Sequence, residues 1–114
     1  MARREVCFVI ARGAIVWSDV SSSPALLPDS RDRWDAIWAH RETLDEVAHS
    51  HPLGPDAFSP EDETTMDALD AALGRPLRYS VVTPTLLIVR EHGHRVGEQS
   101  EPWWVPLLRA ASGM

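Results

Sequence analysis

The segment 49–62 constrains the fold of this chain more than any other, because it marks the end of a strand. His49 and His51 have the spacing of neighbours on one face of a strand, where side chains alternate with a period of two. Pro52 cannot donate a hydrogen bond to a sheet, so the strand is predicted to stop there. The pattern predicts a strand over Leu44 to His51, with both imidazoles at its end.

The residues that follow predict a turn and then the start of a helix. Leu53-Gly54-Pro55-Asp56 is typical of a turn. In Ser59-Pro60-Glu61-Asp62, Ser59 is the expected N-cap, Pro60 occupies the first helical position and Asp62 the third. The helix is predicted to run from Pro60 to about Leu73, where Gly74 and Pro76 end it.

Together these two ends predict a metal site. His49 and His51 supply two nitrogens from the strand, and Asp62 supplies a carboxylate oxygen across a short loop. Three such ligands with an open fourth position favour a catalytic zinc site over a structural one. The single cysteine, Cys7, excludes an internal disulfide and a thiolate-rich zinc site.

Apolar patterning predicts the remaining elements and one fold class. We expect these elements: strands over Val6–Ile10, Ala14–Trp17, Leu77–Val82, Leu86–Val89 and near Arg95-Val96, a loop over Val20–Pro28, and a helix from Asp29 or Ser30 to about Arg41. The order predicts an α/β fold, a mixed central β-sheet flanked by helices, in a single domain over residues 1–114.

Tryptophans mark two apolar surfaces. Trp34, Ile37 and Trp38 fall at i, i+3 and i+4, which predicts one helical stripe facing the core. The tail 102–108 is apolar enough to pack back on the body or on a partner. Within it, Trp103-Trp104 is interpreted as a core contact or as the contact of a possible homodimer.

Strand alternation also bears on the choice of a catalytic base. Four residues are expected to share the face opposite the two histidines: Leu44, Glu46, Ala48 and Ser50. Glu46 therefore points away from the metal, whereas Glu5 precedes a strand that can pair beside the histidine strand. The pattern favours Glu5 as the base. Asp45 and Ser50 are candidate hydrogen-bond partners of the imidazoles.

Charge and hydropathy limit the partners. The net charge of −6 argues against nucleic acid, since phosphate binding requires a basic face. No apolar run approaches the length of about eighteen residues that a membrane span needs. We also find no signal peptide pattern, because Val6–Ile10 is too short and follows Glu5 directly. The chain is therefore interpreted as cytoplasmic, without a membrane partner.

These motifs resemble those of a known family. His49-Ser50-His51-Pro52, seven intervening residues, Ser59, two more residues and Asp62 resemble the signature of the JAMM (MPN) zinc metallopeptidases. Arg4-Glu5-Val6-Cys7 matches the upstream glutamate of that family, which is often followed by a cysteine two residues later. The expected helices also fall where the family has them, so the resemblance covers nearly the whole chain and implies the MPN/JAB, cytidine-deaminase-like architecture.

The resemblance implies an activity as well. It implies one Zn²⁺ per chain on the two histidines and Asp62, with Glu5 as general base and then acid. Ser59 is implied to hydrogen-bond the developing oxyanion. The implied substrate is an amide or isopeptide bond at the C-terminal tail of a ubiquitin-like or sulfur-carrier protein, and the implied class is a small bacterial processing peptidase.

Three other interpretations remain open from sequence. One is a non-catalytic MPN scaffold module that binds partners, although such modules typically lack the ligands. A second is a RadC-like protein, whose motif is also His-x-His-Pro followed by Ser-Pro-x-Asp. A third is an iron(II) oxygenase that uses two histidines and a carboxylate. His92-Gly93-His94 is a further His-x-His pair, but its glycine predicts a solvated hairpin tip.

Overall fold

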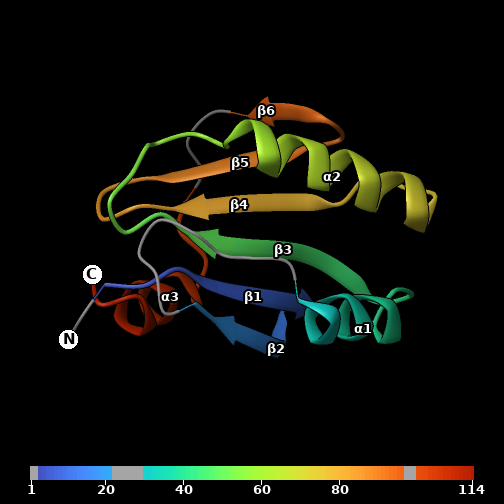
Figure 1. Ribbon diagram of the computed structural model, residues 1–114, viewed down its shortest axis with the longest axis horizontal. Coiled ribbons are helices and arrows are strands. Elements are labelled where there is room, and N and C mark those ends of the chain that lie inside the picture. Colours follow the sequence, from blue (N-terminus) through green and yellow to red (C-terminus); the bar gives the residue numbers. More distant parts are fainter. Residues whose placement is uncertain (1–2, 22–29, 97–99) are drawn as a thin grey trace.

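A six-stranded mixed sheet forms the centre of the molecule (Figure 1). The computed structural model describes residues 3–21, 30–96 and 100–114. Its strands are β1 (Val6–Ala11), β2 (Ala14–Val20), β3 (Leu44–Ser50), β4 (Arg78–Val82), β5 (Leu87–Glu91) and β6 (His94–Val96). Its helices are α1 (Arg31–Ala39), α2 (Pro60–Leu73) and α3 (Val105–Ala111). The strand order is β2-β1-β3-β4-β5-β6, and only the pair β3–β4 is parallel.

Helices cover both faces of this sheet, as expected for an α/β fold (Figure 1). On one face, Ile37 of α1 and Met66 of α2 pack with Val9 of β1. On the other face, Leu108 of α3 packs with Phe8. Because consecutive residues of β1 alternate between the two clusters, α3 lies on the side opposite α1 and α2.

The expected elements are present, with shifted ends and one addition. β3 stops at Ser50, one residue before the predicted end, and α1 stops at Ala39 with Ser30 as its N-cap. The predicted loop Val20–Pro28 starts too early, since Val20 belongs to β2, and residues 22–28 lie outside the described part of the chain. The fold class, an α/β fold with a mixed central sheet, is confirmed.

The apolar tail forms a helix that was not predicted from the sequence. Val105–Ala111 is α3, and Pro106 lies in its first turn, where a missing N–H costs nothing. Trp104 is buried in the core at 2% exposure, whereas Trp103 is 60% exposed. The two tryptophans therefore have different surroundings, and only Trp104 is a core contact.

The predicted stripe of α1 does not face the core as a whole. Ile37 is buried, but Trp34 and Trp38 are 36% and 54% exposed. The three side chains share one side of the helix, and that side borders the space between α1 and α2. There they line a cavity of about 230 Å³ together with Leu69 and Leu73.

Leu44 departs from strict alternation in β3. It packs with Val9 and Ile37, on the face opposite the one expected. The pairing with β1 explains this, because Ile10 opposes Glu46 while Ala11 opposes Leu44. The extra residue is a β-bulge, which reverses the direction of the side chain at the start of the strand.

None of the helices in the described ranges combines the length and the apolar character needed to cross a membrane.

Candidate metal centre

The two histidines lie where β3 ends, between β1 and β4. His49 is paired with Cys7 of β1 and with Val81 of β4. The backbone N–H of His51 donates to the carbonyl oxygen of Val82 at 2.8 Å, which prolongs the alignment with β4 by one residue. His49 therefore projects from a part of the sheet that is paired on both sides, and His51 stays hydrogen-bonded to β4.

Three potential ligand atoms converge at this point. Nε2 of His49 lies 3.1 Å from Nε2 of His51 and 3.3 Å from Oδ2 of Asp62. The third side of the triangle, between His51 Nε2 and Asp62 Oδ2, is 3.6 Å. Ligands about 2.0–2.2 Å from a tetrahedral zinc ion are separated by about 3.3–3.5 Å. The triangle therefore has the dimensions of one face of a tetrahedral site.

A backbone carbonyl directs the lone pair of His51 into this triangle. Nδ1 of His51 lies 3.0 Å from the carbonyl oxygen of Pro55, which can only accept a hydrogen bond. Nδ1 must therefore carry the proton, and in the neutral ring Nε2 offers its lone pair. Burial disfavours the charged ring, but Asp62, the Pro55 carbonyl and Glu5 outweigh it and raise the pKa of His51.

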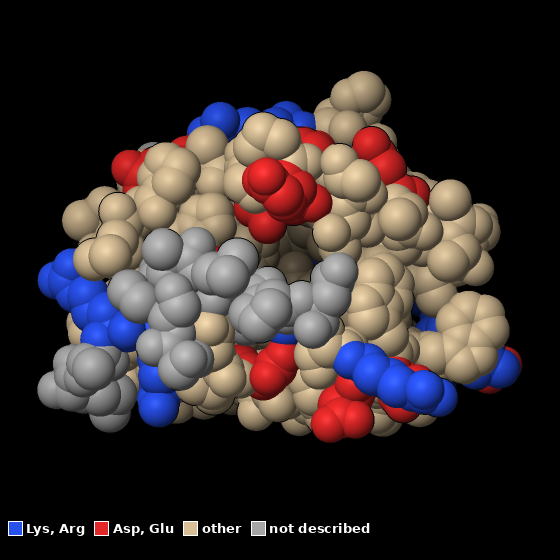
Figure 2. Space-filling model, viewed as in Figure 1, with Lys and Arg blue, Asp and Glu red and all other residues tan. Residues whose placement is uncertain are grey.

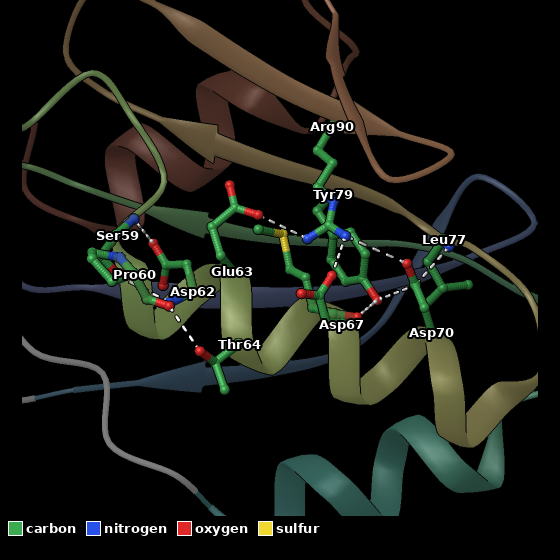
Figure 3. Close-up of polar contacts among 11 residues, drawn as sticks. Ser59, Pro60, Asp62, Glu63, Thr64, Asp67, Asp70, Leu77, Tyr79 and Arg90 are labelled. Atoms are coloured by element: carbon green, nitrogen blue, oxygen red, sulfur yellow. Dashed lines mark hydrogen bonds and ion pairs between the residues drawn. The ribbon is translucent and has the colours of Figure 1, made fainter.

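Asp62 takes part in the helix start and in the triangle at once. Its backbone N–H donates to Oγ of Ser59 at 3.0 Å, and its Oδ2 accepts the backbone N–H of Ser59 at 2.8 Å, which forms a capping box (Figure 3). Burial opposes ionisation, but hydrogen bonds to His49 and His51 outweigh it and lower the pKa of Asp62 far below its ordinary range. The carboxylate is thus anionic and held at a fixed orientation.

Glu5 lies against the same two imidazoles. It is only 5% exposed, and its Oε1 lies 3.7 Å from Nε2 of His51. One ligand atom each from Glu5, His49 and His51 lie within 4.8 Å of one another, and such a group can hold a metal ion. Burial raises the pKa of Glu5, and the nearby imidazoles only partly offset this effect.

The end of α3 anchors the segment that carries Glu5. Arg4 donates its backbone N–H to the carbonyl oxygen of Ser112 at 3.0 Å and its Nε–H to that of Ala111 at 2.8 Å. On the other side of Glu5, the N–H of Val6 donates to Oγ of Ser50 at 2.9 Å. The Ser50 hydroxyl in turn lies 2.6 Å from that of Ser112. These contacts fix the backbone on both sides of Glu5, and they were not predicted from the sequence.

Two proposed partners of the imidazoles lie elsewhere. Asp45 is exposed and accepts the N–H of Gly13 at 3.1 Å. Ser50 faces α3, so neither side chain supports the histidines. Glu46 points away from the triangle, as expected, and contacts Ser80 and Arg78 on the other face. The carbonyl of Pro55, which has no side-chain signature in the sequence, takes the supporting role instead.

The second His-x-His pair stands apart from the site. His92 and Gly93 have positive φ angles of 52° and 76°, which form the tight turn between β5 and β6. His92 and His94 are both exposed at this hairpin tip. They share no cluster of potential ligands with other described residues.

Acidic side chains gather on the face that carries α1 and α2. Figure 2 shows a hollow near the middle of this face, with acidic groups along its upper border. The first turn of α2 alone contributes Glu61, Asp62 and Glu63. These carboxylates favour a cation near the start of α2.

Comparisons of the chain with protein-family models, with curated proteins and with solved structures found no match.

Proposed function

We propose that this chain is a zinc-dependent metallopeptidase of the JAMM type with an MPN-like architecture. One observation carries the proposal: Nε2 of His49, Nε2 of His51 and Oδ2 of Asp62 converge at 3.1–3.6 Å. When both imidazoles are neutral with Nε2 unprotonated, these three atoms present lone pairs to one another, and a cation between them stabilises the arrangement. The resemblance of the motif to the JAMM signature supports the same assignment.

The donor set favours zinc among the common metal ions. Two imidazole nitrogens and one carboxylate oxygen suit Zn²⁺, whereas Ca²⁺ and Mg²⁺ prefer sites built from oxygen alone. His49, His51 and Asp62 would hold the ion. Bound zinc supplies a Lewis acid that polarises a carbonyl and lowers the pKa of a water molecule towards neutrality.

The remaining residues account for proton transfer. Glu5 is buried beside His51 with a raised pKa, which brings its proton affinity closer to that needed near neutral pH. In the proposed reaction its carboxylate accepts a proton from the attacking water and then donates it to the leaving amine. The contacts of Arg4 and Val6 hold Glu5 in place for both steps.

Ser59 can act as N-cap and as hydrogen-bond donor at once. Its Oγ accepts the N–H of Asp62 through a lone pair, which leaves the hydroxyl proton free to donate. We infer that this proton stabilises the oxyanion that develops on the scissile carbonyl, a contribution of roughly 3 kcal/mol in comparable sites.

The proposed substrate is the C-terminal tail of a ubiquitin-like or sulfur-carrier protein, and this part rests on the family resemblance. An extended tail binds readily to the free edge of a sheet by strand addition. β2 is an edge strand, and its last residue, Val20, pairs with Val6 directly after Glu5. A tail added to this edge would run two strand spacings, about 10 Å, from β1, the strand that follows the proposed base.

Metal content per chain tests the proposal, measured by mass spectrometry of metals on protein purified without chelators. We expect about one zinc in the wild type and in Glu61→Gln, an exposed control in the same helical turn, and far less in Asp62→Ala. Iron in place of zinc would favour the oxygenase interpretation. A wild type that binds no metal, even after zinc is added, would contradict the proposal.

Turnover is tested next on sulfur-carrier and ubiquitin-like proteins that carry a C-terminal extension. Wild type is expected to remove the extension, and Glu5→Gln is expected to retain zinc and lose turnover. A fully active Glu5→Gln variant would remove Glu5 from the mechanism. A zinc-loaded wild type that cleaves none of these fusions would favour the scaffold interpretation.

A further inference from the structure

Polar contacts as well as apolar packing hold the helix that supplies Asp62 on the sheet. Only Met66 and Leu69 are buried among the fourteen residues of α2. Three acidic residues of the helix follow at a spacing of i, i+4 and i+7: Glu63, Asp67 and Asp70. This spacing places them along one side of the helix, next to the apolar stripe of Met66, Leu69 and Leu73 that packs in the core.

Arg90 of β5 contacts all three of these acidic residues (Figure 3). Its guanidinium lies 3.0 Å from Oε2 of Glu63, 2.6 Å from Oδ1 of Asp67 and 3.8 Å from Oδ2 of Asp70. The side chain of Arg90 is only 6% exposed. A guanidinium is planar and its donors have fixed directions, so this one group fixes two turns of α2 relative to β5.

The neighbouring strand provides a second attachment near the end of the same helix. The hydroxyl of Tyr79 donates to Oδ1 of Asp70 at 2.7 Å, and the backbone N–H of Leu77 donates to the same oxygen at 3.0 Å. Tyr79 of β4 is also the cross-strand partner of Arg90. Arg90 and Tyr79 thus form one paired unit of the sheet that binds successive turns of α2.

A metal ligand at the start of a helix requires that helix to be placed accurately. A shift of one residue along an α-helix moves a side chain by 1.5 Å and rotates it by about 100°. Coordination tolerates only about 0.2 Å in the metal–ligand distance. Asp62 directly precedes Glu63 in the sequence. The contact between Glu63 and Arg90 therefore holds the helix at the residue next to the proposed ligand.

Stability alone does not explain why Arg90 is buried. Its Nε is buried and makes no hydrogen bond within the described residues. A buried cation with an unsatisfied donor is costly, and apolar side chains of similar volume often stabilise such a position equally well. The burial of Arg90 is better explained by its contacts with α2, which orient that helix.

We propose that Arg90, together with Tyr79, is a positioning residue for Asp62. It sets the axial position and the rotation of α2, so that Oδ2 of Asp62 stays within coordinating distance of both histidines. This inference rests on the metal site proposed above. It assigns no contact between Arg90 and the metal ion or the substrate.

Zinc affinity of the purified full chain, measured by competition with a chromophoric chelator, tests this role. Arg90→Met is expected to bind zinc about tenfold or more weakly than wild type, the loss typical of residues that orient ligands. Arg78→Met is the matched control, since Arg78 is a half-buried arginine of β4 that pairs with Glu46 and Glu91 and not with α2. Equal affinity of Arg90→Met and wild type would overturn the proposal, as would an equal loss in Arg78→Met.

A double-mutant cycle separates positioning from a general structural effect. In the background Asp62→Ala, where Glu5, His49 and His51 are the remaining potential ligands, Arg90→Met is expected to cause no further loss of affinity. A loss as large as that in the wild-type background would show that Arg90 does not act through Asp62. The absorption spectrum of the Co²⁺-loaded protein is expected to change in Arg90→Met and not in Arg78→Met, because it reports the coordination geometry.

A milder variant covers the case in which Arg90→Met does not fold. Tyr79→Phe removes one hydroxyl and keeps the ring, and it is expected to weaken zinc binding in the same direction; unchanged affinity there would overturn the proposal. Absence of zinc binding in wild type would overturn both this inference and the proposed function. Normal binding in wild type and in both sheet variants would overturn the positioning role alone.

Discussion

Oδ2 of Asp62 lies 3.3 Å from Nε2 of His49, although one residue starts a helix and the other ends a strand. The same oxygen accepts the backbone N–H of Ser59 at 2.8 Å. One lone pair of the carboxylate therefore completes the helix cap, while the other faces the imidazoles. Binding of a cation and formation of the first turn of α2 are coupled through this single atom.

Zinc is expected to stabilise the fold through this coupling. A ligand present at 1,000 times its dissociation constant stabilises the native state by about 4 kcal/mol. Wild type should therefore unfold at a clearly higher temperature with zinc than with a chelator. Asp62→Asn can still accept the N–H of Ser59, but it loses the anionic ligand, so its thermal shift should be small. Equal shifts in the two proteins would argue against coordination by Asp62.

Two substitutions at Ser59 separate its role as a cap from its role as a donor. Alanine at an N-cap costs about 1 kcal/mol of stability, whereas glycine costs only a few tenths. Both substitutions remove the hydroxyl, and loss of an oxyanion donor lowers kcat by about 10²–10³. We expect Ser59→Ala and Ser59→Gly to differ in unfolding free energy but to lose turnover equally. Near-normal turnover in Ser59→Gly would leave Ser59 as a cap only.

Ser50→Ala is expected to destabilise the protein by about 1–3 kcal/mol. Ser50 is fully buried, and its removal leaves the backbone N–H of Val6 without an acceptor in the core. Ser112→Ala is the matched control, because it removes the neighbouring hydroxyl and leaves that acceptor in place. Urea unfolding of the metal-free proteins should show the larger loss in Ser50→Ala. The reverse order would mean that the Val6 contact contributes little.

The parts of the site that lie close together in sequence could be predicted. Ser59 and Asp62 form the expected capping box because both of its hydrogen bonds span only three residues. His49 and His51 converge because strand alternation and the proline after them are local signals. Glu5 required a pairing between distant strands, which the sequence suggests but does not specify. The structure pairs Cys7 with His49 and so brings Glu5 beside His51.

The contacts that hold the site depend on how distant elements pack together, and such packing leaves only weak signals in the sequence. A bulge at the start of β3 moved Leu44 to the other face, and no residue type marks a bulge reliably. For α3, Pro106 followed by Leu107 to Ala111 was an available signal, since proline favours the first turn of a helix. For Arg90, the signal was a charge directly after the apolar run Leu86–Val89 and a helix with acidic residues at i, i+4 and i+7. The resemblance to the JAMM family stays a prediction.

Glu46 leads to a prediction about how the free energy of unfolding depends on pH, and this prediction does not involve the metal site. Burial raises the pKa of Glu46 above its ordinary value of 4.5, and contacts with Ser80 and Arg78 only partly offset this. Between pH 4.5 and the raised pKa, the native state keeps a proton that the unfolded chain has released. The contribution of Glu46 to the free energy of unfolding is therefore full at low pH and falls as pH rises through this window.

Glu46→Gln carries no titratable group and should lack this fall. We expect wild type to lose stability relative to Glu46→Gln as pH rises from 4.5 to the raised pKa, by at most about 1.4 kcal/mol per pH unit. Urea unfolding of metal-free protein across this pH range measures the difference, with exposed Glu42→Gln as the control. Parallel profiles for wild type and Glu46→Gln would mean that Arg78 compensates burial fully. A wild type that gains stability with pH would mean that the ion pair outweighs burial.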